Sequence, residues 1–141
     1  TPTYLVDAKH RDALHEYGMS LGIAFQLADD VLDLVQDRET LGKPSCGDIV
    51  EGKKTVPIIA LREALDAAGL ARLAAMSGRE LTGDDRDWVA AMMESTGARE
   101  KTEALARNYC EAARASLDGL PATPYKDAMI AVTDFVIARE S

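Results

Sequence analysis

Three aspartates stand in an otherwise uncharged, apolar stretch, and this pattern limits most strongly how the chain can fold. Between residues 19 and 35 the only charged residues are Asp29, Asp30 and Asp33. At helical spacing, these carboxylates and Gln26 share an arc of about 100°, and the rest of the circumference is apolar. A surface helix would have a broader polar face along its whole length. The pattern therefore predicts a helix buried nearly all round, whose acidic stripe needs a compensating cation.

This stripe has two interpretations. An arbitrary Asp-Asp-x-x-Asp pattern on an amphipathic helix most often faces water or pairs with lysine and arginine. Here the apolar flanks favour a metal site, and oxygen donors without histidine or cysteine suit Mg²⁺, which fills its other positions with water and substrate phosphates. An EF-hand is excluded, because the pattern lacks the loop glycine and has apolar residues at loop positions.

The segment after the stripe carries the opposite charge. Between residues 36 and 55, glycines stand beside lysines in Gly42-Lys43 and Gly52-Lys53-Lys54, with Gly47-Asp48 between them. We expect no regular structure here, because glycine and proline interrupt the run. Lysines in such a loop are ordinarily solvated. Beside an acidic stripe, however, they could hold a diphosphate between metal ions and ammonium groups.

The remaining sequence predicts an all-α protein. The length of 141 residues suits one domain, alanine is the commonest residue and aromatic residues make up only 5%, which favours helices over strands. We expect a helical bundle, or part of one, forming a single domain or partial domain over residues 1–141. Thr82 and Asp85 have the spacing of a helix cap, and Thr123-Pro124 predicts the start of the last helix. The expected helices cover residues 5–35, 57–65, 70–76, 98–117 and the segments after Thr82 and Thr123.

Charge and cysteine content exclude several classes of protein. A net charge of -8 argues against a nucleic-acid binder or a basic membrane-surface helix. No stretch approaches the about 20 apolar residues of a membrane span. Cys46 and Cys110 form neither a CxxC motif nor a Cys/His cluster, so we expect a reducing, cytoplasmic compartment. The chain begins at Thr1 without a methionine or a signal peptide, which favours a fragment or a processed product.

The acidic stripe and the lysine segment together resemble the trans-isoprenyl diphosphate synthases. The agreement in order and spacing extends over residues 22–57 and includes the family's second aspartate-rich motif and its lysine loop. Residues 117–121, Phe135 and Arg139 are similar to the family's ending, and Thr1 resembles the threonine of its Lys-Thr pair. The resemblance implies the C-terminal half of an all-α fold built around a deep cavity. The matching segments are Gly22-Ile-Ala-Phe-Gln-Leu-Ala-Asp-Asp-Val-Leu-Asp33, Leu41-Gly-Lys-Pro44 and Asp48-Ile-Val-Glu-Gly-Lys-Lys-Thr-Val-Pro57.

The resemblance also implies a metal site. Asp29 would bind Mg²⁺ directly, and Asp30 and Asp33 would support the metal ions or their waters. Asp48 would lie in the outer shell of that site. The ions would stabilise a departing diphosphate.

Substrate-binding residues are implied in the same way. Lys43 and Lys53 would hold an allylic diphosphate, and Gln26 and Thr1 would direct oxygen dipoles at the cationic carbon. The double bond of isopentenyl diphosphate would attack that carbon, giving a longer isoprenyl diphosphate. The complete protein would be a homodimer.

Some features depart from the family. The first aspartate-rich motif and the basic residues for isopentenyl diphosphate belong to the other half of the fold, so we expect this chain alone to lack a full site and to be inactive. Cys46 stands where the family usually has glycine, which leaves the path of the lysine loop open. Two alternatives remain: a terpene cyclase, disfavoured because its second motif is usually an Asn/Ser/Glu pattern, and a non-catalytic helical subunit that associates with a partner.

Overall fold

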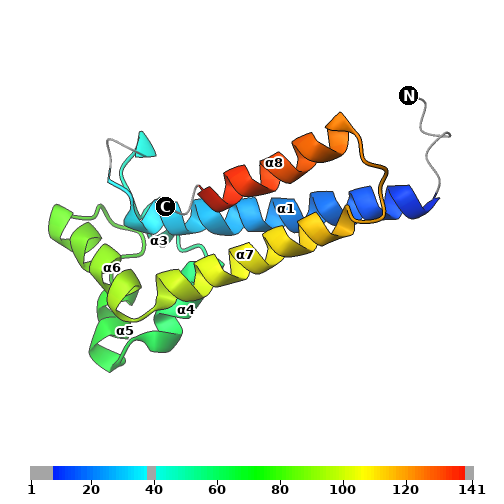
Figure 1. Cartoon of the computed structure of the whole chain (residues 1–141). Helices are drawn as coiled ribbons and strands as arrows, with labels where there is room; N and C mark the ends of the chain where they lie inside the picture. The colour runs from blue at the N-terminus through cyan, green and yellow to red at the C-terminus, as the bar shows by residue number, and fades with distance from the viewer. Residues whose placement is uncertain (1–7, 38–40, 139–141) are drawn as a thin grey trace. The chain divides into compact units, whose positions relative to one another are not determined.

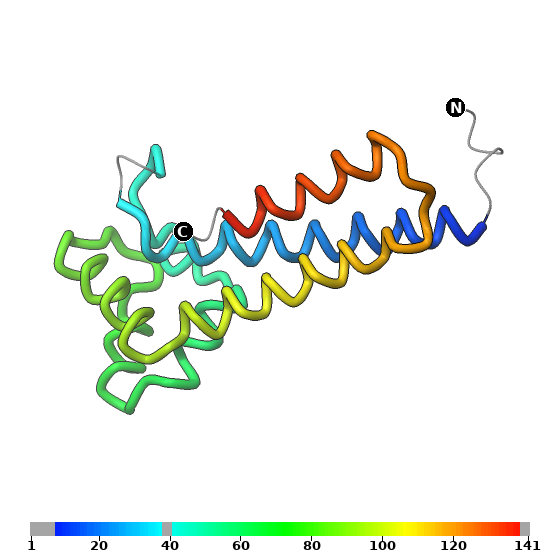
Figure 2. Tube along the Cα trace, viewed as in Figure 1, coloured from blue at the N-terminus to red at the C-terminus, as the bar shows by residue number. Residues whose placement is uncertain are grey.

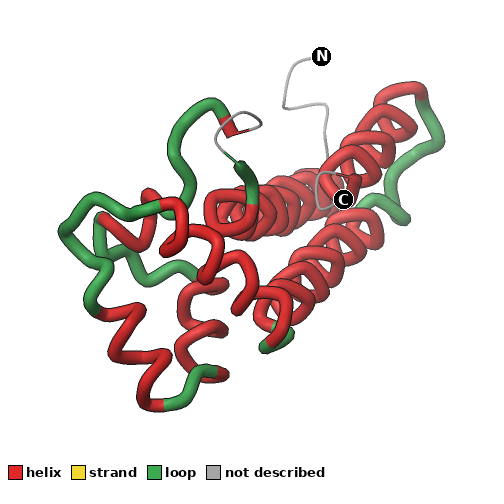
Figure 3. Tube along the Cα trace, turned by 90° about the vertical axis from the view of Figure 1, so that its left-hand side faces the viewer, coloured by secondary structure: helices red, strands yellow, loops and turns green. Residues whose placement is uncertain are grey.

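A computed structural model of the chain describes residues 8–37 and 41–138, and every regular element in these ranges is an α-helix (Figures 1 and 3). The predicted all-α fold class is confirmed. The chain divides into two compact units, one made of Thr1–Gln26 with Leu105–Ser141 and the other of Leu27–Ala104. None of the described helices is long and apolar enough to cross a bilayer. The helices are α1 (Ala8–Val35), α3 (Gly47–Val50), α4 (Val56–Ala64), α5 (Ala67–Ala74), α6 (Gly83–Ser95), α7 (Ala98–Ser116) and α8 (Pro124–Ala138).

The first unit combines the start of α1 with the end of α7 and with α8. The end of α7 and α8 both lie beside α1. They are consecutive in the chain and run in opposite directions (Figure 2). The Tyr17 hydroxyl on α1 donates a hydrogen bond of 2.8 Å to the Met129 carbonyl on α8. Ala24, Cys110 and Val136, one from each helix, form a small buried core. The three helices therefore share one small apolar core.

The prediction that α1 is buried nearly all round is wrong for this unit. Met19 is 54% exposed, and Ile23 and Phe25 are each 38% exposed. Among the described residues, no atom outside the helix's own backbone comes within 4 Å of a Cβ built at Gly18 or Gly22. The physical reason is that α7 and α8 cover only part of the circumference of α1.

The second unit has the larger core. Leu34 at the end of α1 packs in one cluster with Leu61, Met76, Val89 and Met93 from the segments that follow. Two helix starts in this unit are set by side-chain caps: the Asp66 carboxylate accepts from the Gly69 N–H at the start of α5 (2.8 Å), and Thr82 caps α6. The cap that the Thr82–Asp85 spacing predicts is confirmed.

The segment between α1 and α4 is more regular than we predicted. It contains one helical turn, α3, preceded by Cys46 in a left-handed conformation with φ of 65°. The Cys46 N–H donates a hydrogen bond of 2.7 Å to the carbonyl of Asp33. Gly52, with φ of 73°, follows α3 and redirects the chain toward α4. These contacts return the segment onto the end of α1.

Candidate functional site

Asp33 anchors the lysine loop to α1. Its side chain is buried, and its carboxylate Oδ2 accepts a hydrogen bond of 3.1 Å from the Asp48 N–H. Its own carbonyl accepts from Cys46, so one residue holds both ends of the turn that leads into α3. A Cβ built at Gly47 lies 3.6 Å from Asp33 Oδ1, in ordinary contact. A single aspartate thus sets the position of the loop.

The other carboxylate oxygen of Asp33, Oδ1, has no hydrogen-bond partner within residues 8–37 and 41–138. Oδ1 is buried and no described residue donates to it, and the Lys43 Nζ lies 3.9 Å away on a side chain that is 64% exposed. Burial raises the pKa of Asp33, while the Asp48 N–H and the charge of Lys43 act in the opposite direction. An unsatisfied buried acceptor typically costs about 1–3 kcal/mol. This oxygen is therefore available to a cation.

Lys53 is the second lysine of the site, and it pairs with Asp48 and Glu51. Its Nζ is 3.1 Å from Glu51 Oε2 and 3.6 Å from Asp48 Oδ1, and the contact with Glu51 is the main cause of its raised pKa. Because the lysine is more than half exposed, an ion pair of this kind contributes little to stability and can be exchanged for another anion. Lys43, Asp33, Asp48 and Lys53 form an Asp33–Lys cluster, in which two neighbouring aspartates each lie beside one lysine.

Asp29 and Asp30 lie one turn before Asp33 on α1. Both are half-buried, and each takes part in an interaction with other residues. Among the residues that the structure describes, no group of three or more acidic, histidine or cysteine side chains gathers in a way that could hold a metal ion. The roles of these two aspartates stay predictions.

Gln26 and Thr1 are the remaining predicted site residues. Gln26 is exposed on α1 and belongs to the first unit, whereas the Asp33–Lys cluster belongs to the second. Thr1 lies outside the described residues. The structure therefore brings together four of the predicted residues, all of them in the second unit.

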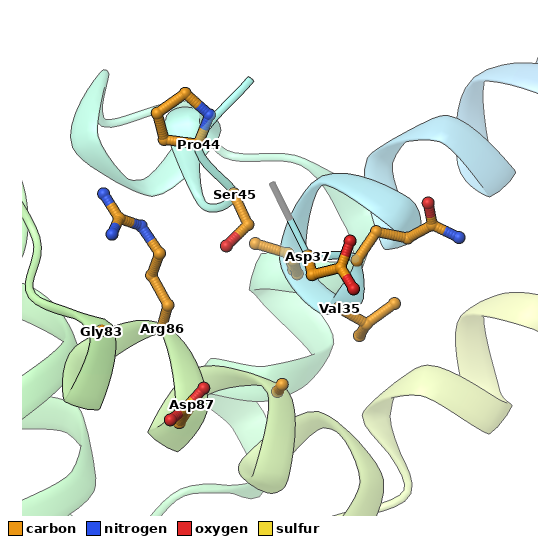
Figure 4. Close-up of a pocket in the computed structure, with 10 residues that line it drawn as sticks. Val35, Asp37, Pro44, Ser45, Gly83, Arg86 and Asp87 are labelled. Carbon is orange, nitrogen blue, oxygen red and sulfur yellow. The ribbon is translucent and has the colours of Figure 1, made fainter. Parts of the chain in front are cut away.

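Sequence reasoning missed a pocket beside the end of α1. It has a volume of about 250 Å³ and is lined by residues 34–37, by Pro44 and Ser45, and by the first turns of α6. Arg86 extends toward Pro44 and Ser45 (Figure 4), and its Nε is buried without a hydrogen-bond partner among the described residues. Arg86 is far from residues 34–37 in the sequence, so no local spacing indicates that they line the same pocket. The partner of Lys53, Glu51, was missed for a similar reason, since loop residues have no period.

Cys46 completes the turn. Its side chain is fully buried, and burial raises the pKa of its thiol to about 11, with the nearby Arg86 charge opposing the shift. The thiol therefore stays protonated at neutral pH and does not act as a nucleophile. Cys110 is likewise buried and is not bonded to Cys46 in a disulfide.

The fold and the site define an all-α protein in which the acidic end of a helix faces a lysine loop. Residues 3–95 match the polyprenyl synthetase family, and the chain belongs to that family. It is 36% identical over 130 residues to the short chain isoprenyl diphosphate synthase of Methanothermobacter thermautotrophicus, a match that covers 91% of this chain and 39% of the relative.

Solved structures agree with this assignment. Polyprenyl synthase from Caulobacter crescentus, complexed with calcium and isoprenyl diphosphate, is 35% identical with a TM-score of 0.85, and the match covers 96% of this chain and 42% of the other. Geranylgeranyl pyrophosphate synthase from Corynebacterium glutamicum, complexed with isoprenyl diphosphate and magnesium, is 29% identical with a TM-score of 0.81, covering 94% and 38%. The chain spans about 40% of the length of the curated relatives it matches. This share is in keeping with one half of the fold.

Proposed function

We propose that this chain is the diphosphate-holding half of a Mg²⁺-dependent prenyltransferase that condenses an allylic diphosphate with isopentenyl diphosphate. The observation that carries the proposal is the buried Oδ1 of Asp33, which lacks a hydrogen-bond partner among the described residues and lies 3.9 Å from Lys43 Nζ. Membership of the polyprenyl synthetase family supports the choice of reaction.

The chemistry of the candidate residues, rather than a preformed cluster among the described residues, favours a magnesium ion. The candidate ligands are all carboxylates, the donors that Mg²⁺ prefers, and Asp33 has one oxygen held by Asp48 and one without a donor. Asp29 would hold the ion, with Asp30 and Asp33 supporting it and Asp48 in the outer shell. When bound, magnesium supplies positive charge that stabilises the departing diphosphate.

The lysines would hold the allylic diphosphate. Lys43 is exposed and only loosely paired, and Lys53 can exchange Glu51 for a phosphate oxygen. Gln26 and Thr1 would orient oxygen dipoles toward the allylic carbon as the bond to diphosphate breaks. The double bond of isopentenyl diphosphate then forms the new carbon–carbon bond and a proton is lost, so no side-chain nucleophile is required. Residues for isopentenyl diphosphate belong to the other half of the fold, and the activity is proposed for the complete protein.

The proposal includes a cytoplasmic homodimer, which the family resemblance implies. The two described cysteines, Cys46 and Cys110, are not joined in a disulfide, which supports a reducing compartment. Light scattering after size-exclusion chromatography of the full-length protein should give twice the mass of one chain. A monomer that is fully active would exclude the dimer from the proposal.

The test is chain elongation by the full-length protein, with an allylic diphosphate and isopentenyl diphosphate, in the presence and absence of Mg²⁺. Asp29→Ala and Asp33→Asn should each lower kcat by about 10²–10³-fold, the range for loss of one charge-stabilising group. Asp118→Asn, an exposed aspartate in the first unit, is the matched control. A folded full-length protein without Mg²⁺-dependent elongation would overturn the proposal in favour of a non-catalytic helical subunit.

A further inference from the structure

A second pocket lies in the second unit, between the lysine loop, α4 and α5. It has a volume of about 520 Å³. One part of its wall carries the cations Lys53, Lys54 and Arg62, and the other part is apolar, with Ile58 and Leu70 among its residues. None of the described residues that line it is acidic. In a chain of net charge -8, such a concentration of positive charge is unusual and attracts anions.

Two of these cations are not used by the fold. Lys53 is held by Glu51 and Asp48, but no ion pair between described residues involves Lys54 or Arg62. Both side chains are exposed and border the same pocket. Like charges that share a concave surface without counterions repel each other, and a bound anion removes that repulsion.

The apolar wall restricts what that anion can be. Leu70 is 37% exposed, and the neighbouring Leu73 and Ile58 continue the wall into the core. A bare phosphate or carboxylate would contact the cations and leave this surface in water. A ligand with a short hydrocarbon tail would bury it, at roughly 25 cal/mol for each Å² removed from water.

The pocket is also held open by the backbone. The Gly78 N–H donates a hydrogen bond of 2.9 Å to the Val50 carbonyl, which ties the end of α3 to the segment after α5. Gly52 approaches Ser77 closely, since a Cβ built at Gly52 would lie 3.3 Å from the Ser77 hydroxyl. Binding therefore requires little rearrangement.

We propose that this pocket binds an amphiphilic anion, with its phosphate or carboxylate head against Lys54 and Arg62 and its tail on Ile58 and Leu70. The site shares only Lys53 with the Asp33–Lys cluster and requires no metal ion. It does not rest on the proposed prenyl transfer.

Calorimetric titration of the full-length protein with decyl phosphate, below its micellar concentration and with EDTA present, tests the proposal. Decyl phosphate should bind at least about tenfold more tightly than inorganic phosphate or decanol, because each lacks one half of the contact. Lys54→Ala and Arg62→Ala should each weaken binding by about tenfold. Decanoate as a second probe distinguishes the sources: tighter binding of decanoate indicates a fatty acid, and tighter binding of decyl phosphate indicates a phosphorylated lipid.

Two control variants locate the site. Lys101→Ala removes an equivalent exposed charge, which pairs with Glu63 at 3.4 Å outside the pocket, and should leave the affinity unchanged. Lys43→Ala should also leave it unchanged. Loss of binding in Lys43→Ala, with wild-type affinity in Lys54→Ala and Arg62→Ala, would overturn the proposal. In the unmutated protein, NMR shifts caused by decyl phosphate should concentrate in residues 52–77, and shifts confined to other residues would overturn it equally.

Discussion

Asp33 positions the loop, yet one of its buried carboxylate oxygens has no donor among the described residues. Its carbonyl and its Oδ2 hold the loop through the N–H groups of Cys46 and Asp48, whereas its Oδ1 is buried without a donor among the described residues. A residue selected only for stability would not keep a buried charge in this state, because neutral side chains of similar shape are easier to bury. This conflict between stability and charge is typical of a ligand-binding position.

The conflict predicts that Asp33→Asn stabilises the metal-free protein. Since burial raises the pKa of Asp33, the folded state binds its proton more tightly than the unfolded chain. Its contribution to stability is therefore greatest below the ordinary carboxyl pKa and is lost as the pH rises through the folded value. An amide keeps the bond from Asp48 without the charge, so we expect the free energy of unfolding at pH 7 to rise by about 1 kcal/mol.

Urea unfolding in EDTA at pH 7 and at pH 4 measures this effect. The difference between wild type and Asp33→Asn should shrink at pH 4, where the wild-type carboxyl approaches its protonated form. Asp118→Asn should show no difference at either pH. A variant that is markedly less stable than wild type at pH 7 would mean that the Asp33 charge is compensated within the fold.

Cys46 is a non-glycine residue in left-handed conformation, and this predicts that Cys46→Gly and Cys46→Ala have similar stabilities. Left-handed backbone costs an L-residue roughly 1–2 kcal/mol, a cost that glycine does not carry. Against this, Cys46→Gly loses about 0.8 kcal/mol for one more buried carbon than Cys46→Ala, and about 0.5–1 kcal/mol of chain entropy. We expect the two variants to differ by less than about 0.8 kcal/mol in free energy of unfolding.

Cys110 provides the matched comparison. It is equally buried but lies inside α7, where glycine is unfavourable. Cys110→Gly should therefore be about 2 kcal/mol less stable than Cys110→Ala. Denaturant midpoints of the four variants decide the question, and the same large gap at both cysteines would show that position 46 carries no backbone strain.

At the level of elements, the start of α6 depends on one carboxylate. Asp85 Oδ2 accepts from Arg79 Nη1 (3.0 Å) and from the Thr82 N–H (3.1 Å), while Thr82 Oγ1 accepts from the Asp85 N–H (3.1 Å). Arg72, whose guanidinium lies 4.6 Å from the centre of the Trp88 ring, is 3.8 Å from the same carboxylate. Asp85 thus joins the cap of α6 to the two arginines of the preceding helix and turn.

This arrangement predicts a specific acid sensitivity. The hydrogen bond from Arg79, followed by that from Thr82, lowers the pKa of Asp85 from 3.8 to about 2. A lowered folded pKa gives stability that is present above pH 3.8 and is lost as the pH falls through about 2. Asp85→Asn should lower the thermal midpoint at pH 7, and its curve should converge with that of wild type near pH 2.

Two further variants separate charge from capping. Asp84→Asn changes the exposed neighbour and should leave the pH profile unchanged. Thr82→Ala removes the cap and should cost about 1 kcal/mol at every pH. A constant difference between wild type and Asp85→Asn from pH 7 to pH 2 would show that the Asp85 charge has no part in stability.

The same elements show why part of the structure could be predicted from sequence. The cap of α6 and the start of α8 follow from residues within one turn of each other, so local spacing is sufficient. The single turn of α3 depends on a contact with Asp33, and the exposure of Ile23 and Phe25 depends on what covers α1; neither is a local property. For the site, charge pattern and family resemblance indicated Asp33, Lys43, Asp48 and Lys53. The pocket beside Arg86 and the pairing of Lys53 with Glu51 could not be predicted, because both depend on the path of the loop between α1 and α4.

At the scale of the whole molecule, the Asp33–Lys cluster and both pockets lie within Leu27–Ala104. The larger buried core belongs to the same unit, and in it Met93, Leu61 and Val89 pack in one cluster with the loop residues Cys46 and Ile49. Rigid packing below a loop restricts motion to the loop itself. The effects of a diphosphate bound at the Asp33–Lys cluster should therefore be strongest in residues 41–55.

This localisation gives the last prediction. Mg²⁺ with inorganic diphosphate at 100 times its dissociation constant should stabilise the full-length protein by about 2.7 kcal/mol, because only the folded state assembles the site. Lys43→Ala with Lys53→Ala should remove most of this stabilisation, and Lys101→Ala and Lys54→Ala should not. Thermal unfolding measures its size, and hydrogen exchange should place the greatest added protection in residues 41–55. An equal shift in the double variant would mean that diphosphate binds elsewhere, and the Asp33–Lys cluster would then no longer support the proposed diphosphate site.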